Sequence, residues 1–490
     1  MAGRVSFVNA EILMNVTPTE TRVAVVENGV LQEIYIERTN HRGLVGNIYK
    51  GKVVRVLPGM QAAFVDIGLE RAAFIHAAEV GKGDANAPIN QLLHEGQSLV
   101  VQVTKDPIST KGARLTTQLA IPSRYLVYMP GVDHVGVSQR IEEEGERDRL
   151  KELVNNCMEA EGLTGEAGFI LRTAAEGVGE DEILADTRYL RRLWRKLEER
   201  IKDNKAPSLV YDELPLSLRT IRDLSRPEVS KILIDSRETF QKIEHFTQQY
   251  VPEVSERVEY YPGPRPIFEL YSVEDEIQRA LERKVPLKSG GYLVVDQTEA
   301  MTTIDVNTGG FVGRRNLEET IYKTNLEAAT AIGRQVRLRN LGGIIILDFI
   351  DMTEPEHQRQ VLRMLEKMLE KDHTKSKISG VSELGLVEMT RKRTRESLEH
   401  MLMEPCKACD GRGSVKTAET ICYEIFREIL REERAYEAGT YSVLASQQVV
   451  DRLLDEDSHG LADLEAFIGK AIKLQVESQY TQDQYDIILQ

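Results

Sequence analysis

The sequence predicts a multidomain protein that combines α+β and α/β parts. Its 490 residues exceed what one hydrophobic core supports, so several domains are expected. Short alternating strand patterns fill residues 1–121, and residues 290–394 alternate strand, helix, strand and helix. With 41% hydrophobic and 29% charged residues, the composition excludes a mainly disordered chain.

Turn signals divide these patterns into segments. Residues 1–38 hold the pieces EILMNVT, TRVAVVE and LQEIYIE, separated by Thr-Pro and Asn-Gly, and predict a small antiparallel sheet. Residues 138–205 favour helix, interrupted by the apolar strand GFILRT. Residues 207–286 mix a helix with the strand KILID, and residues 417–490 predict a small mixed domain.

Charge is unevenly distributed along the chain. The net charge is 63 − 78 = −15, which by itself argues against a nucleic-acid partner, because phosphates are bound by clustered cations. Residues 39–121, however, contain 9 basic and 6 acidic residues, whereas residues 417–490 contain 6 basic and 15 acidic ones. This asymmetry indicates that the two regions have different partners.

Neither a membrane span nor a secretion signal is evident. The longest apolar run, residues 342–350, is shorter than the roughly 18 residues that a span needs. The start, MAGRVSFVNAEILMNV, lacks a long apolar core followed by a cleavage site. We therefore expect a cytoplasmic protein with no membrane span.

Residues 39–121 predict a small barrel of the oligonucleotide-binding (OB) kind, because they contain several short strands separated by turns. Phe64 and Phe74 are out of phase with the apolar alternation, so they are expected to face outward. Together with Lys111 and two further lysines they would form a stacking platform for single-stranded nucleic acid. Two phenylalanines are nonetheless more often part of a core.

Two acidic strand ends are the best candidates for chemistry. In TTIDVN, Asp305 and Asn307 lie on one face of a strand, and in GGIIILD, Asp348 ends an apolar run typical of a central strand. If the strands are neighbours, two carboxylates and an amide meet at one sheet edge. Oxygen ligands of this kind suit Mg²⁺. The alternative is that these residues only cap strand ends.

Several cations could bind phosphate. Arg172 and Thr173, at the end of GFILRT, could hold an anion, although nothing local distinguishes this from a surface salt bridge. A denser cluster follows in TRKRTRE and could contact phosphates or form a solvated helix face; it comprises Arg391, Lys392, Arg393 and Arg395.

Cys406 and Cys409 have the CxxC spacing of a zinc knuckle. They supply only half of a tetrahedral site, and Cys157 and Cys422 are isolated in the sequence. A four-thiolate site would therefore need two chains. The alternative is a redox pair, which favours a helix start, whereas here Pro and Gly surround the motif.

A resemblance to a known family covers nearly the whole chain. The stretches GNIYKGKVVRVLPGMQAAFVDIG, KGARLTT, FILRTAAEG, TTIDVNTG, NLGGIIILDFIDM, GLVEMTRKRTRESL and PCKACDGRG resemble, in that order, the bacterial ribonuclease E/G family. The resemblance implies an endoribonuclease that cuts single-stranded RNA to leave 5′-monophosphates. It would be stimulated by a 5′-monophosphate and act in ribosomal RNA 5′-end maturation and messenger RNA decay.

The resemblance also implies a domain order. It comprises an RNase H-like domain (1–38 and 211–284), an S1 (OB) barrel (39–121), a 5′-phosphate-sensing segment (122–210), a DNase I-like catalytic domain (285–402), a zinc link (403–416) and a small C-terminal domain (417–490).

Site residues are implied in the same way. Asp305 and Asp348 match Mg²⁺ ligands and Asn307 an assisting amide. The other matches are RNA contacts at Phe64, Phe74 and Lys111, a 5′-monophosphate pocket at Arg172 and Thr173, and zinc ligands at Cys406 and Cys409 that join two chains into a homodimer or a higher oligomer. Ser123 stands where the longer members have glycine, so the surroundings of the 5′-phosphate pocket differ.

Two other hypotheses remain. One is a non-catalytic S1-type RNA-binding or assembly protein whose carboxylates are structural, and Mg²⁺ dependence separates it from a hydrolase. The other is a nuclease for single-stranded DNA, because no local feature recognises a 2′-OH.

Overall fold

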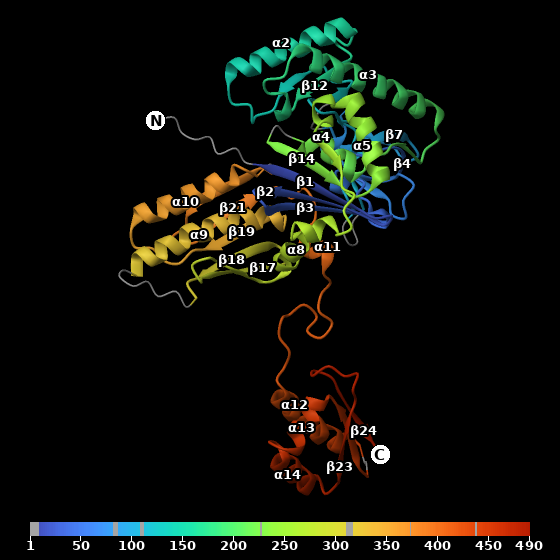
Figure 1. Ribbon diagram of the computed structural model, residues 1–490. Coiled ribbons are helices and arrows are strands. Elements are labelled where there is room, and N and C mark those ends of the chain that lie inside the picture. The colour runs from blue at the N-terminus through green and yellow to red at the C-terminus, as the bar shows by residue number, and fades with distance from the viewer. Residues whose placement is uncertain are drawn as a thin grey trace. The chain divides into compact units, whose positions relative to one another are not determined.

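The computed structural model describes residues 9–81, 87–107, 112–225, 228–309, 317–372, 374–436 and 439–490. These residues form five sheets and their covering helices, in two compact units, Met1–Leu398 and Glu399–Gln490 (Figure 1). The predicted mixed α+β class is confirmed. In the described parts of the chain, no helix is long and apolar enough to cross a membrane.

One sheet joins two distant parts of the sequence. Its order is β15-β14-β1-β2-β3, and β1 pairs in parallel with β14, which follows it by more than two hundred residues. The strands are β1 (Ala10–Val16), β2 (Glu20–Glu27), β3 (Val30–Arg38), β14 (Val229–Ile234) and β15 (Val258–Tyr260). The accompanying helices are α4 (Leu216–Leu224), α5 (Arg237–Tyr250), α6 (Pro252–Ser255), α7 (Ile267–Leu270) and α8 (Val273–Leu281). The chain between β3 and α4 is therefore an insertion in this layer.

The insertion begins with a closed barrel. Five strands run in the order β4-β5-β6-β8-β7 and close through a β4–β7 pairing, with β13 added outside β4. Their bounds are β4 (Ile48–Leu57), β5 (Ala62–Asp66), β6 (Ala73–His76), β7 (Ser98–Lys105), β8 (Arg114–Thr116) and β13 (Ser208–Tyr211), and α1 is Ile89–Leu92. A Cβ on Gly51 would lie 2.6 Å from Cγ1 of Val65, so glycine permits this tight closure. This closed five-stranded barrel is consistent with the expected OB type.

A four-stranded sheet and two long helices follow. The order is β11-β12-β10-β9, with β9 (Ile121–Pro122), β10 (Leu126–Pro130), β11 (Val135–Val137) and β12 (Ala167–Leu171). The helices α2 (Glu144–Glu161) and α3 (Glu180–Asp203) pack onto it, and their apolar faces share one core with Phe169. Arg172 directly follows β12 and therefore lies at the end of a buried strand.

The fourth sheet has the order β16-β17-β18-β19-β21-β20. Its strands are β16 (Lys284–Pro286), β17 (Tyr292–Gln297), β18 (Met301–Asn307), β19 (Gly343–Asp348), β20 (Ser376–Val381) and β21 (Val387–Arg391). Only β18 and β19 pair in parallel, because α9 (Leu317–Leu338) crosses between them. Helix α10 (Pro355–Leu369) packs beside α9 (Figure 1), and a Cβ on Gly333 would lie 2.6 Å from that of Met368.

The second unit contains a small sheet and helices of its own. Its order is β23-β22-β24, with β22 (Tyr441–Ala445) parallel to β23 (Ile472–Val476) and antiparallel to β24 (Tyr485–Leu489). The helices α12 (Ala418–Ala435), α13 (Gln447–Leu454) and α14 (Ser458–Ile468) pack on this sheet, whereas α11 (Leu398–Leu402) precedes the CxxC segment.

Buried arginines tie the larger unit together. Arg337 of α9 is ion-paired with Glu33 of β3 at 2.8 Å, which joins the first sheet to the fourth. Arg391 donates to Asp372 at 2.6 Å, and both side chains are less than 5% exposed. The hypothesis that Arg391 contacts phosphate is therefore wrong, because burial and Asp372 occupy its guanidinium. Arg395 stacks on Tyr35, whereas Lys392 and Arg393 remain exposed.

We predict that Asp372→Ala destabilises the larger unit by about 3–5 kcal/mol, because it leaves the Arg391 charge buried without a partner. Urea unfolding followed by circular dichroism measures the loss. Glu238→Ala, which breaks an exposed pair with Lys242, is the matched control and should leave the unfolding midpoint unchanged. Equal midpoints for both variants would contradict a structural role for the buried pair.

Candidate active site and its surroundings

The two carboxylates meet because β18 and β19 pair in parallel. In the register of this pairing Asp305 lies opposite Asp348, on adjacent strands about 4.8 Å apart. Their strand neighbours Ile304 and Leu347 are fully buried, so both carboxylates project from the other face. Asn307 donates from Nδ2 to Oδ2 of Asp305 at 2.6 Å. The structure thus brings together all three residues that the sequence pattern singled out.

The carboxylate pair carries electrostatic strain that a cation would relieve. Partial burial, followed by the charges of Asp305 and Asp351, raises the pKa of Asp348. The described residues contain no group of three or more His, Cys, Asp or Glu side chains able to hold a metal. Two carboxylates and an amide are oxygen donors of the kind that Mg²⁺ takes in proteins, where it also keeps several waters.

Asn325 supports this edge, and sequence inspection missed it. This fully buried amide of α9 donates to the carbonyl of Ile350 at 2.7 Å and accepts from its N–H at 3.1 Å. It thereby fixes the loop that begins after Asp348. The available signal was an asparagine within an alanine-rich helix, where asparagine is intrinsically unfavourable.

Phe64 and Phe74 face outward from the barrel, as expected. They are directly paired on β5 and β6, with ring centroids 6.2 Å apart in an edge-to-face arrangement. Arg55 on β4 pairs with Phe64, and Arg114 on β8 pairs with Phe74, so four adjacent strands present one row of cation, ring, ring and cation. The two arginines were missed because register is invisible in the sequence. Lys111 lies outside the described residues.

Arg172, the candidate for the 5′-phosphate pocket, is held by a carboxylate and a backbone carbonyl. Its guanidinium donates to Asp223 of α4 at 2.7 Å and to the carbonyl of Ser123. Burial alone would raise the pKa of Asp223, but the charges of Arg222 and Arg172 outweigh it and hold the pKa below its usual value. Thr173 exchanges a 3.1 Å hydrogen bond with Ser138.

The hydroxyl of Ser123 does not face the arginine. It is buried and donates to Asp186, whose carboxylate also accepts from the N–H of Tyr125 at 2.8 Å. The backbone of Ser123 alone therefore reaches Arg172, so a serine here adds a structural hydrogen bond and no pocket ligand.

Backbone N–H groups surround both sulfurs of the cysteine motif. Backbone N–H groups of Cys409 and Ala408 point at the exposed sulfur of Cys406 and lower its pKa, and the N–H of Gly413 lies 3.3 Å from the sulfur of Cys409. Such hydrogen bonds favour thiolates, the form that binds zinc. Cys157 and Cys422 are buried in α2 and α12, and burial raises the pKa of both thiols. Within the described residues, Cys406 and Cys409 belong to no group of three or more side chains able to hold a metal.

Comparison with known proteins agrees with this architecture. A profile described as "Ribonuclease E/G family" matches residues 120–394, and one described as "RNase E/G, Thioredoxin-like domain" matches residues 405–489. Ribonuclease G of Escherichia coli strain K12 is 56% identical over 98% of this chain and 99% of its own length.

Two further relatives widen the comparison. Ribonuclease G of Haemophilus influenzae is 53% identical over 98% of this chain and 99% of its own length. Ribonuclease E of Escherichia coli strain K12 is 37% identical over 89% of this chain but only 41% of its own length. This chain belongs to the ribonuclease E/G family.

Proposed function

We propose that this endoribonuclease hydrolyses single-stranded RNA with Mg²⁺ held by Asp305 and Asp348, and acts in ribosomal RNA 5′-end maturation and messenger RNA decay in the cytoplasm. The main support for this proposal is the parallel register of β18 and β19, which sets the two carboxylates opposite each other. The family membership supports the reaction class.

Three residues of this chain have separate roles in the proposed hydrolysis. Asp305 and Asp348 supply the oxygen ligands, and the 2.6 Å hydrogen bond from Asn307 fixes the orientation of Asp305. Mg²⁺, when bound, polarises the scissile phosphate and lowers the pKa of an attacking water. The water oxygen bonds to phosphorus as the bond to the 3′ oxygen breaks, leaving a 3′-hydroxyl and a 5′-monophosphate.

The row of two arginines and two phenylalanines on the barrel surface would explain a preference for unpaired RNA. Phe64 and Phe74 offer ring faces and edges to splayed bases, while Arg55 and Arg114 offer charge to the flanking phosphates. A duplex keeps its bases stacked inside and cannot use such a row.

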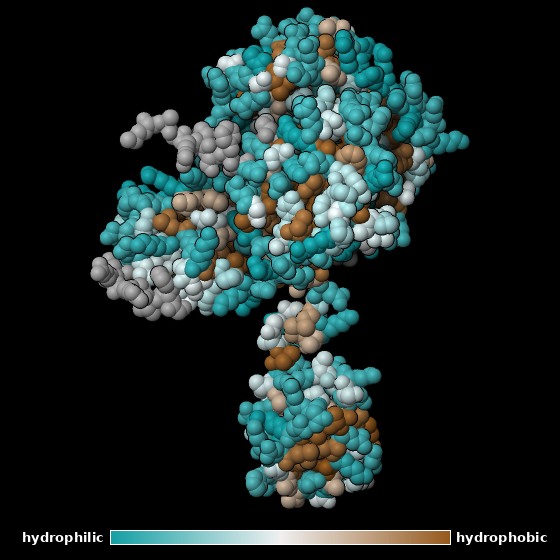
Figure 2. Space-filling view, viewed as in Figure 1, coloured by the Kyte–Doolittle hydropathy of each residue, from teal (hydrophilic) through white to brown (hydrophobic). Residues whose placement is uncertain are grey.

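The remaining assignments are also proposals. The domain order is an RNase H-like domain (1–38 and 211–284), an S1 barrel (39–121), a 5′-sensing segment (122–210), a DNase I-like domain (285–402), a zinc link (403–416) and a small domain (417–490). Support for a homodimer or higher oligomer comes from the half zinc site and from the apolar surface of the second unit. Phe467 of that unit is 78% exposed, and Figure 2 shows a hydrophobic area on the same unit.

We predict that Asp305→Asn and Asp348→Asn each lower cleavage of an unpaired RNA at least about 100-fold while RNA binding persists, because each removes a metal ligand. Rates are measured with Mg²⁺ and with EDTA. Asp296→Asn, on neighbouring β17 and paired with Arg283, is the control and keeps wild-type cleavage. Binding without Mg²⁺-dependent cleavage by the wild type would favour the non-catalytic RNA-binding protein instead.

A second prediction concerns the RNA 5′ end. The wild type should cut a 5′-monophosphorylated RNA faster than its 5′-hydroxyl twin, because the phosphate replaces Asp223 as partner of Arg172. Arg172→Gln should abolish this difference, and Arg149→Gln, which changes an exposed arginine of α2, should preserve it. A persistent difference in Arg172→Gln would place the 5′ pocket elsewhere.

A third prediction concerns zinc. Metal analysis should find one Zn²⁺ for every two chains, and Cys406→Ala should lose zinc and sediment as monomers, because two thiolates per chain fill half a site. Lys407→Ala, between the cysteines, is the control and keeps both zinc and the dimer. One zinc per chain would refute a shared site.

A further inference from the structure

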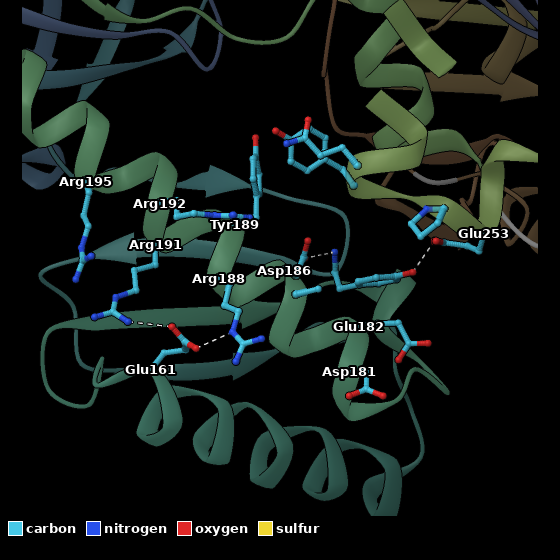
Figure 3. A pocket seen from close by; sticks show the side chains of 15 residues that line it. Glu161, Asp181, Glu182, Asp186, Arg188, Tyr189, Arg191, Arg192, Arg195 and Glu253 are labelled. Atoms are coloured by element: carbon cyan, nitrogen blue, oxygen red, sulfur yellow. Dashed lines mark hydrogen bonds and ion pairs between the residues drawn. The ribbon is translucent and has the colours of Figure 1, made fainter. Parts of the chain in front are cut away.

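A cavity of about 660 Å³ lies between α3 and the α5–α6 segment, outside the carboxylate site. It is called the α3 cavity here, and Figure 3 shows the α3 side chains that line it. Its size falls within the roughly 300–1,000 Å³ of small-ligand sites. Tyr125 joins it to the proposed 5′ pocket, since its ring lines the cavity while its carbonyl accepts from the N–H of Arg172 at 2.8 Å.

Arginines dominate one end of the α3 cavity. They are Arg188, Arg191, Arg192 and Arg195, which all lie within about two turns of α3. Glu161 of α2 accepts from Arg188 at 2.8 Å and from Arg191 at 2.9 Å (Figure 3). Arg192 and Arg195 are exposed and make no ion pair or hydrogen bond to any other described residue.

The position of these arginines is not explained by the helix dipole. Arg192 and Arg195 lie in the middle of α3, two turns or more before its end at Asp203. A favourable dipole interaction is confined to the last turn. Four arginines face only one carboxylate, that of Glu161, at this end of the α3 cavity. This end therefore carries a net positive charge.

Tyrosine rings form the adjoining wall. Tyr189, one turn before Arg192, lies with its ring centroid 4.7 Å from that of Tyr250 on α5. Both side chains are only partly buried, and both line the α3 cavity. Rings beside unpaired guanidinium groups suit a base with its phosphates.

The acidic residues of the lining do not cancel this charge. Asp181 and Glu182 belong to the first turn of α3, about 15 Å along the helix from Arg192. Asp186 is buried and accepts from Ser123 and from backbone N–H groups, and Glu253 accepts from the hydroxyl of Tyr125 at 2.6 Å.

We propose that the α3 cavity binds a nucleotide of an unpaired RNA strand, with the base against Tyr189 and Tyr250 and phosphates at Arg192 and Arg195. This subsite rests on the proposed function, because it anchors the same substrate away from the scissile bond. A free nucleotide has the same base and phosphate groups as a nucleotide within an RNA strand. The test below distinguishes these two ligands.

The test measures RNA binding by fluorescence anisotropy with Mg²⁺ omitted, using an unstructured oligoribonucleotide with a 5′-hydroxyl, so that the 5′ pocket does not contribute. Arg192→Glu/Arg195→Glu should weaken binding about tenfold, and the slope of log K against log salt should fall by about 1.4 as two phosphate contacts are lost. Lys196→Glu/Lys202→Glu makes the same charge change on α3 outside the cavity lining and should retain the wild-type slope.

Base contact is tested separately at Tyr250. Tyr250→Ala should weaken binding about fivefold or more, and Tyr250→Phe should restore it, because stacking needs the ring and not the hydroxyl. Equal losses in the two charge-reversal variants, or no loss in either, would overturn the subsite. The subsite would also be overturned if adenosine monophosphate binds the cavity while the Arg192 substitution leaves the affinity for the oligonucleotide unchanged. The cavity would then be a site for a free nucleotide.

Failure of the proposed hydrolysis and failure of the proposed subsite would give different results. If the wild type cuts no RNA with Mg²⁺ but the binding pattern above holds, the proposed hydrolysis is wrong and the subsite stands. If cutting is normal and Arg192→Glu/Arg195→Glu binds RNA like the wild type, only the subsite is wrong.

Discussion

The pairing of β18 with β19 is the constraint on which the proposed chemistry depends. A parallel pair requires a crossover, and α9 supplies it, so both strands run in one direction and deliver Asp305 and Asp348 to the same edge. The apolar faces of both strands are packed under α9 and α10, which prevents a one-residue slip that would turn the carboxylates into the core. The site is thus a consequence of register and burial.

Buried charges extend this order to the rest of the larger unit. Arg337 crosses from α9 to Glu33 of β3, and Arg391 holds the end of β21 to Asp372 after α10. Removing one partner from either pair would strongly destabilise the fold, because the remaining charge would be buried without a partner. The Arg337 contact fixes the fourth sheet against the first sheet, whose strands come from both sides of the inserted barrel, whereas the Arg391 contact lies within the layer of the fourth sheet.

Patterns that repeat along one strand could be predicted from the sequence, whereas contacts between distant strands could not. Alternation sufficed for the outward Phe64 and Phe74 and for the shared face of Asp305 and Asn307. The row that adds Arg55 and Arg114 depends on pairing across four strands. The partner of Arg172, Asp223, lies on a helix some fifty residues away, and Arg391 looked like a surface cation because its partner Asp372 precedes it by nineteen residues.

The opposed carboxylates of Asp305 and Asp348 are proposed to form one divalent-ion site. Titration of the zinc-loaded protein with Mn²⁺ as a spectroscopic substitute for Mg²⁺, followed by electron paramagnetic resonance, tests it most directly. We expect one bound Mn²⁺ per chain in the wild type, and loss of that ion in both Asp305→Asn and Asp348→Asn. Unchanged Mn²⁺ binding in both variants would contradict it, and the two aspartates would then be ordinary strand-end residues.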